Sequence, residues 1–157
     1  MLGFRPLGSA PLADDGSRAA QIAVPISDIS DGSWLNELGS NTNLFASIDE
    51  SAASDVDYII SSALGSGSSD TCEVGLTSLT DPTSSSGHTV SYRYRAQGTG
   101  TMNLTVRLMQ GATIIASWTH TSVSTTYATA TQTLSGAEAD AITNYTDLRL
   151  RFVATGA

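Results

Sequence analysis

The sequence predicts an all-β protein: an antiparallel, jelly-roll-like β-sandwich with one short helix and an extended N-terminal arm. Three observations favour this fold. Charged residues make up only 14% of the 157 residues, while 23 Ser, 20 Thr and 14 Gly suit polar sheet faces and turns. Apolar and polar residues alternate over several segments, which is the period of a β-strand. No helical pattern is present that could connect parallel strands. We therefore expect one sandwich domain over residues 22–157.

The first 21 residues form a separate segment, which we expect to be an extended docking arm. Pro6 and Pro11 fix φ and favour extended neighbours. Its large apolar residues follow neither the helix period nor the strand period; they are Leu2, Phe4, Leu7 and Leu12. Such a segment cannot build a core alone and orders against another surface. A disordered or self-packed terminus is the alternative.

The next part of the chain contains strand patterns separated by turns. Ile22, Val24 and Ile26 alternate with smaller residues and predict a first strand, and Asp31-Gly32 predicts a turn before Trp34. We expect further strands over Leu44–Ile48, Tyr58–Ser61 and Cys72–Leu76, and loops over Gly65–Asp70 and Asp81–Gly87.

The clearest alternation follows residue 88. Strands are expected over Val90–Ala96, Met102–Leu108, Ala112–Thr121, Tyr127–Leu134 and Leu148–Phe152. Gln110-Gly111 predicts the turn of a hairpin. Ser135 and Glu138 have the spacing of a capping box, which predicts a short helix over about residues 136–144.

The charge and cysteine content exclude several classes of protein. The net charge is −8 and all seven basic residues are Arg, which argues against nucleic acids and anionic membranes as partners. Cys72 has no second cysteine to pair with, and we expect it in the core. No apolar run is long enough to span a bilayer and no secretory pattern is present, so we expect a soluble protein made in a cytoplasm.

Chemistry-bearing residues do not form a catalytic pattern. His88 and His120 are expected at the surface or at strand ends, away from any metal-ligand spacing. Asp49, Glu50, Asp55 and Asp57 lie within nine positions. This spacing permits a calcium ion without demanding one, and a solvated loop is the expected state. We predict no enzyme activity, no metal and no cofactor.

Aromatic and basic residues give two hypotheses about surfaces. Tyr92, Tyr94 and Trp118 are expected in the core, whereas Trp34 beside a turn is the ring most expected to be exposed, with burial an equal alternative. Five arginines are expected on the outer faces of strands: Arg93, Arg95, Arg107, Arg149 and Arg151. If those strands are neighbours, the arginines form one basic face for carboxylates of an adjacent subunit. A solvated face is the alternative.

Several segments together resemble small structural proteins of tailed-phage virions. The opening FRPLGSAPLADD is similar to short leaders of such proteins. The similarity continues from Asp31 to Trp34 and through GHTVSYRYRAQG, NLTVRLMQGATIIASWTHT and TQTLSGAEADAITNYTDLRLRFVA. It covers nearly the whole chain, although no single motif is diagnostic of one function.

The resemblance implies a capsid decoration, cement or head-fibre protein, commonly a homotrimer on the virion surface. Its partner would be the major capsid protein. The leader would then contact the shell through Phe4, Arg5, Pro6, Leu7, Pro11 and Leu12. The alternative is a head- or tail-fibre domain that binds host-surface glycans, with aromatic rings and carboxylates around one pocket near Trp34 and residues 49–57.

Overall fold

The computed structural model describes residues 20–157 as a β-sandwich with two unequal layers. The predicted docking residues Phe4, Arg5, Pro6, Leu7, Pro11 and Leu12 lie outside the described part. Ala20 and Gln21, the end of the predicted arm, lie inside it. The Gln21 amide donates to the carbonyl of Thr80 and accepts from its N–H, both at 2.8 Å. The chain is therefore joined to the domain from Gln21 onward.

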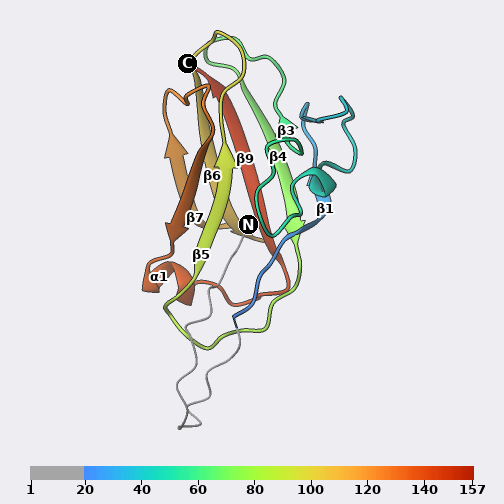
Figure 1. Ribbon diagram of the computed structural model, residues 1–157. Helices are drawn as coiled ribbons and strands as arrows, with labels where there is room; N and C mark the ends of the chain where they lie inside the picture. The colour runs from blue at the N-terminus through green and yellow to red at the C-terminus, as the bar shows by residue number, and fades with distance from the viewer. Residues whose placement is uncertain (1–19) are drawn as a thin grey trace.

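The first layer is an antiparallel five-stranded sheet in the order β1-β4-β9-β6-β7 (Figure 1). Its strands are β1 (Pro25–Ser30), β4 (Ser69–Leu76), β6 (Met102–Gln110), β7 (Thr113–His120) and β9 (Leu148–Gly156). The C-terminal strand β9 lies at the centre, where it pairs along its length with β4 and β6. This pairing of distant segments makes β9 the middle of the fold.

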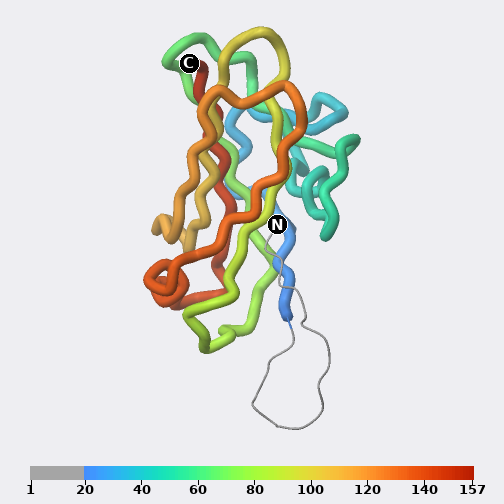
Figure 2. Tube along the Cα trace, turned by 60° about the vertical axis from the view of Figure 1, so that its left-hand side comes forward, coloured from blue at the N-terminus to red at the C-terminus, as the bar shows by residue number. Residues whose placement is uncertain are grey.

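The second layer is much narrower. It consists of a two-stranded ribbon, β5 (Thr89–Tyr94) and β8 (Ala128–Thr133), which packs over one face of the sheet (Figure 2). A less regular segment lies beside the ribbon; it contains β2 (Leu35–Asn36), η1 (Leu44–Ser47) and β3 (Ile59–Ile60). Neighbouring strands lie about 4.8 Å apart, so the five-stranded sheet is about 19 Å wide whereas the ribbon spans only about 5 Å.

The core lies between these layers, and the predicted alternation places its residues. Leu148 and Leu150 of β9 are buried, while Arg149 and Arg151 point to the opposite face. Cys72 is fully buried as expected, and burial raises the pKa of its thiol to about 12. Other core residues come from both layers: Val74, Leu76, Val90, Tyr92, Val106, Leu108 and Leu134. Burial of these side chains is the main stabilising term of the fold.

The first strand, predicted from the alternation of Ile22, Val24 and Ile26, is present as β1 but begins only at Pro25. Ala23 and Pro25 are buried, whereas Ile22 and Ile26 are half exposed. β1 pairs with β4 through two register shifts, one between Pro25 and Ser27 and one between Asp28 and Ser30. A shift of one residue exchanges the two faces of a strand, so regular alternation does not hold along β1.

The segment Leu44–Ile48 is not a strand. Residues Leu44–Ser47 form the 3₁₀ helix η1. The carboxylate of Asp28 accepts the N–H groups of Leu44 and Phe45 at 2.9 and 2.8 Å. A tertiary contact from β1 therefore satisfies the free amides of this turn, and it overrides the local strand preference.

The C-terminal half follows the prediction closely. The capping box at Ser135 and Glu138 is present, although the helix α1 (Gly136–Asp140) ends earlier than expected. Gly111, with φ of 54°, forms the hairpin turn between β6 and β7. A bulge in β7 buries both Ile115 and Ala116 and leaves Ile114 exposed, and Trp118 is partly buried against the core. Within residues 20–157, no helix is long and apolar enough to cross a membrane.

Asp70, at the start of β4, holds the irregular segment to the sheet. Its side chain is buried and accepts hydrogen bonds from the N–H of Ser33 and from the N–H and hydroxyl of Ser62. The predicted turn at Gly32 is fixed at the same place, because a Cβ there would lie 2.2 Å from the carbonyl oxygen of Thr71. One carboxylate thus positions two loops that are far apart in sequence.

We predict that Asp70→Ala lowers the free energy of unfolding by about 3 kcal/mol, because it leaves buried donors without an acceptor. Asp49→Ala, at an exposed position, is the control and should change it by less than about 0.5 kcal/mol. Chemical denaturation followed by tryptophan fluorescence measures both values. Equal stabilities of the two variants would show that Asp70 does not hold the loops.

Candidate functional site

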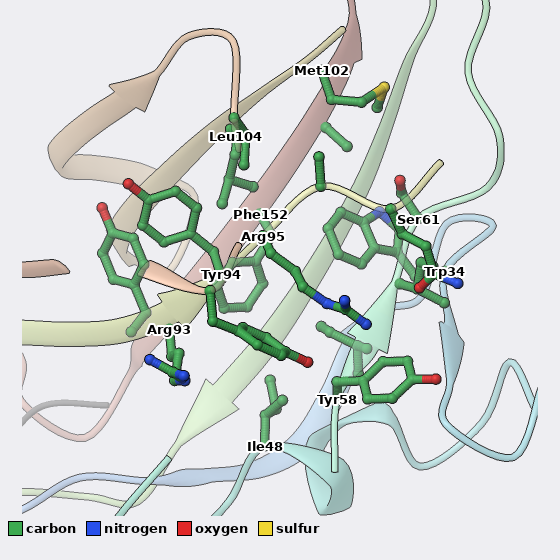
Figure 3. A pocket seen from close by; sticks show the side chains of 18 of the residues that line it. Trp34, Ile48, Tyr58, Ser61, Arg93, Tyr94, Arg95, Met102, Leu104 and Phe152 are labelled. Atoms are coloured by element: carbon green, nitrogen blue, oxygen red, sulfur yellow. The ribbon is translucent and has the colours of Figure 1, made fainter. Parts of the chain in front are cut away.

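An open cleft of about 630 Å³ lies between the two parts of the second layer (Figure 3). One wall is the β5–β8 ribbon with the loop after β5, and the other wall is formed by residues 47–64. The floor is the inner face of the five-stranded sheet. The ribbon and the irregular segment meet at Asp55, which contacts Arg93 and Tyr127, but they leave part of that face uncovered, and this space is the cleft.

The floor of the cleft is apolar. Met102, Leu104 and Phe152 project from β6 and β9 and are only partly buried. Trp34 closes one side, with its ring 6.3 Å from that of Phe152. Trp34 is only 6% exposed, so of the two alternatives that the sequence left equally open, burial is the correct one. Its flanking turn suggested the surface, but the segment folds back over the sheet and covers the indole.

The ribbon wall carries two arginines that lie against one aromatic ring. The guanidinium groups of Arg93 and Arg95 lie 4.7 and 4.6 Å from the centroid of the Tyr127 ring. Arg93 also forms a bidentate ion pair with Asp55, with Nη2 and Oδ2 2.8 Å apart. Hydrogen bonding to Arg93 lowers the pKa of the Asp55 carboxyl below its usual range. Within residues 20–157, no carboxylate forms an ion pair with Arg95.

The opposite wall carries two carboxyl groups, Glu50 and Asp57. Partial burial raises the pKa of Glu50, and the negative charges of Asp49 and Asp57 add to this effect. The predicted acidic cluster therefore divides, because Asp55 turns to Arg93 while Glu50 and Asp57 line the cleft. No group of three or more metal-ligating side chains is found within residues 20–157. The geometry gives no support to a calcium site.

Behind the ribbon, His120 joins the two layers of the sandwich. The hydroxyl of Tyr92 lies 2.7 Å from its Nε2, and the hydroxyl of Tyr94 lies 2.8 Å from its Nδ1. A neutral imidazole has one donor and one acceptor, so one tyrosine donates to the ring and the other accepts from it. Burial lowers the pKa of His120, which favours this neutral form. His120 is thus a strand-end residue, as predicted, but it has a structural partner on each side.

His88 is fully buried, so the prediction of a surface position does not hold. Its Nε2 lies 2.7 Å from the hydroxyl of Tyr145. Burial is the main cause that lowers the pKa of His88. His88 is the residue directly before β5, so the expectation of a strand-end position is correct. The sequence alone did not show that Tyr145, in the loop before β9, covers it.

The five arginines do not form one basic face. Arg107, Arg149 and Arg151 lie on the outer face of the five-stranded sheet, whereas Arg93 and Arg95 belong to the other layer. On the outer face, Glu73 is only 5% exposed and accepts from Arg149 at 3.2 Å and from Arg151 at 2.6 Å. Asp147 also pairs with Arg149, with 2.9 Å between Oδ1 and Nη2. Two of these cations are therefore neutralised within the chain, which weakens the case for a carboxylate-binding face.

No family model matches the chain, and no curated protein or solved structure shows detectable similarity to it. The resemblance to phage virion proteins therefore remains a hypothesis from sequence. Arg95 was expected on a sheet face, and neither its place at the cleft nor its lack of an ion pair could be predicted. Both depend on the pairing of Asp55 with Arg93, which are 38 positions apart.

We predict that acidification destabilises the domain through its two histidines. Both have a pKa below the ordinary value of about 6.5, which they regain when the chain unfolds. At pH values between the folded-state pKa and about 6.5, the histidines bind more protons in the unfolded chain than in the folded one. The free energy of unfolding therefore falls as the pH drops below about 6.5, until the folded-state pKa is reached. Denaturation curves from about pH 7.5 to about pH 5.5 measure this slope.

His120→Gln should reduce that slope, because it removes one of the two groups. Asp147→Asn should leave the slope unchanged in this range, because Asp147 pairs with Arg149 and does not act on the pKa of either histidine. If wild type and His120→Gln lost the same stability on acidification, the assignment of His120 would fail.

Proposed function

We propose that this chain is a non-enzymatic structural protein of a phage virion, which binds the outer surface of the protein shell as a capsid decoration or cement protein. A row of three exposed isoleucines, two in the edge strand β1 and one just before it, is the observation that carries this proposal. Ile22, Ile26 and Ile29 are 48%, 50% and 46% exposed. Exposed apolar residues on an unpaired strand edge are typical of a surface that another chain covers.

The edge presents no outward charge, although Pro25 and two register shifts in β1 limit pairing along it. Natural edge strands usually carry Lys residues or other outward charges. Here Asp28, the one charged residue of β1, turns to η1 and caps it. Within residues 20–157, no strand pairs with the second edge of β1. A segment of a partner protein could therefore lie along this edge and bury the three isoleucines.

The position of this row in the chain supports the same proposal. It follows directly after the leader, whose apolar residues are Leu2, Phe4, Leu7 and Leu12. Leader and edge are neighbours in the sequence, so one shell protein could contact both. In this proposal Phe4, Arg5, Pro6, Leu7, Pro11 and Leu12 dock on the major capsid protein, and copies of the domain assemble as a homotrimer. The resemblance of the sequence to small virion proteins is the second support.

The alternative, a fibre domain that binds host-surface glycans, has less support. Tyr58, Glu50 and Asp57 do line one cleft near Trp34. However, the Trp34 ring that was expected to form the platform for a sugar is buried. The rest of the floor consists of aliphatic side chains and Phe152, which offer no hydrogen bonds to hydroxyl groups.

We predict that deleting residues 1–16 abolishes binding to phage shells that lack this protein, without unfolding the domain. Co-sedimentation with such shells measures binding, and circular dichroism checks the fold. Unchanged co-sedimentation of the truncated protein would contradict the docking role of the leader.

We also predict that the pair Ile26→Lys and Ile29→Lys weakens shell binding by at least about tenfold, because charged side chains would have to be desolvated at the interface. The matched control is Ile114→Lys, since Ile114 is 49% exposed on β7 at the opposite edge of the same sheet. Stability of all variants should change by less than about 0.5 kcal/mol. Equal binding of the β1 and β7 variants would exclude β1 as the docking edge.

A further inference from the structure

The cleft combines an uncovered apolar floor with one unpaired cation. Phe152, Leu104 and Met102 face the open space and are not covered by either part of the second layer. A volume of about 630 Å³ lies within the usual range of small-molecule sites, about 300–1,000 Å³. Such a floor favours a ligand with an apolar body over a sugar or another densely hydroxylated molecule.

The charges around the rim define the polar end of the ligand. Asp55 neutralises Arg93 through two hydrogen bonds. Arg95 lies in the electrostatic range of Asp55, but they form no ion pair. Its guanidinium stacks on Tyr127 and extends into the cleft toward Trp34 and Tyr58 (Figure 3). A guanidinium held in this way is suited to bind a carboxylate through two parallel hydrogen bonds.

The opposite wall limits the charge of the ligand. Glu50 and Asp57 face the same space and repel further negative charge. A ligand with several anionic groups, such as a phosphate ester, would meet this repulsion wherever it extends beyond Arg95. A single carboxylate at the Arg95 end avoids it.

From these contacts we propose that the cleft binds a small amphipathic monocarboxylate, an acyl or aryl carboxylate. Its apolar body lies on Leu104 and Phe152, and its carboxylate pairs with Arg95. This inference is independent of the proposed attachment to a shell, because the cleft and the β1 edge use different residues.

The methionines provide a direct test in the full-length protein. Met102 lines the cleft, whereas Met109 is fully buried and does not. With isotope-labelled methionine methyl groups, titration with decanoate or naphthoate should shift the Met102 signal saturably and leave that of Met109 in place. Methyl decanoate, which has the same chain without the charge, should bind about tenfold more weakly or worse.

Arg95→Gln should weaken binding of both carboxylates by about tenfold or more, while leaving the weak binding of the ester unchanged. Arg107→Gln, on the outer face of the sheet, is the matched control and should bind as the wild type does. The proposal is overturned if neither carboxylate shifts Met102 saturably, if the ester binds as tightly as decanoate, or if Arg95→Gln binds normally. Shell binding by Arg95→Gln should be unaffected, which separates this site from the attachment surface.

Discussion

The unequal width of the two layers determines most features of this protein. Five strands present an apolar inner face, and a ribbon of two strands covers only part of it. The irregular segment over residues 31–64 covers another part, and the space between the two covers is the cleft. In a sandwich with two sheets of equal width, side chains of both would interdigitate and fill this space. Here the irregular segment is held by polar contacts instead of strand pairing.

Buried and half-buried polar groups replace the missing strands as the connection between the layers. Asp28 and Asp70 each accept several hydrogen bonds from loop residues. His120 joins β7 to Tyr92 and Tyr94 of the ribbon. Satisfied groups of this kind stabilise one arrangement of the layers, because any other would leave them buried without partners. They also make the stability of the domain sensitive to pH, since one of them is His120, whose pKa burial lowers.

The sequence predicted the features that depend on neighbouring residues. Alternation in β6 and β9, the capping box at Ser135 and the burial of Cys72 are local properties, and the structure confirms them. The helix η1 and the burial of Trp34 depend on contacts with distant strands. The strand predicted over Leu44–Ile48 was therefore wrong, and the sequence left the burial of Trp34 open. The split of the arginines between two layers has the same cause, since only strand pairing decides which arginines share a face. The alternative hypothesis placed a pocket near Trp34 and residues 49–57, and Trp34, Glu50 and Asp57 do line the cleft. Its apolar floor could not be predicted, because no local pattern records how far the second layer extends.

The cleft depends on one claim: the inner face of the sheet is uncovered at Met102, Leu104 and Phe152. Solvent relaxation of methionine methyl signals by a soluble paramagnetic probe tests it in the unliganded protein. We expect strong attenuation of the Met102 signal, while the Met109 signal is protected by its full burial. Equal protection of both methyl groups would show that the two covers meet over the sheet and that the cleft is closed.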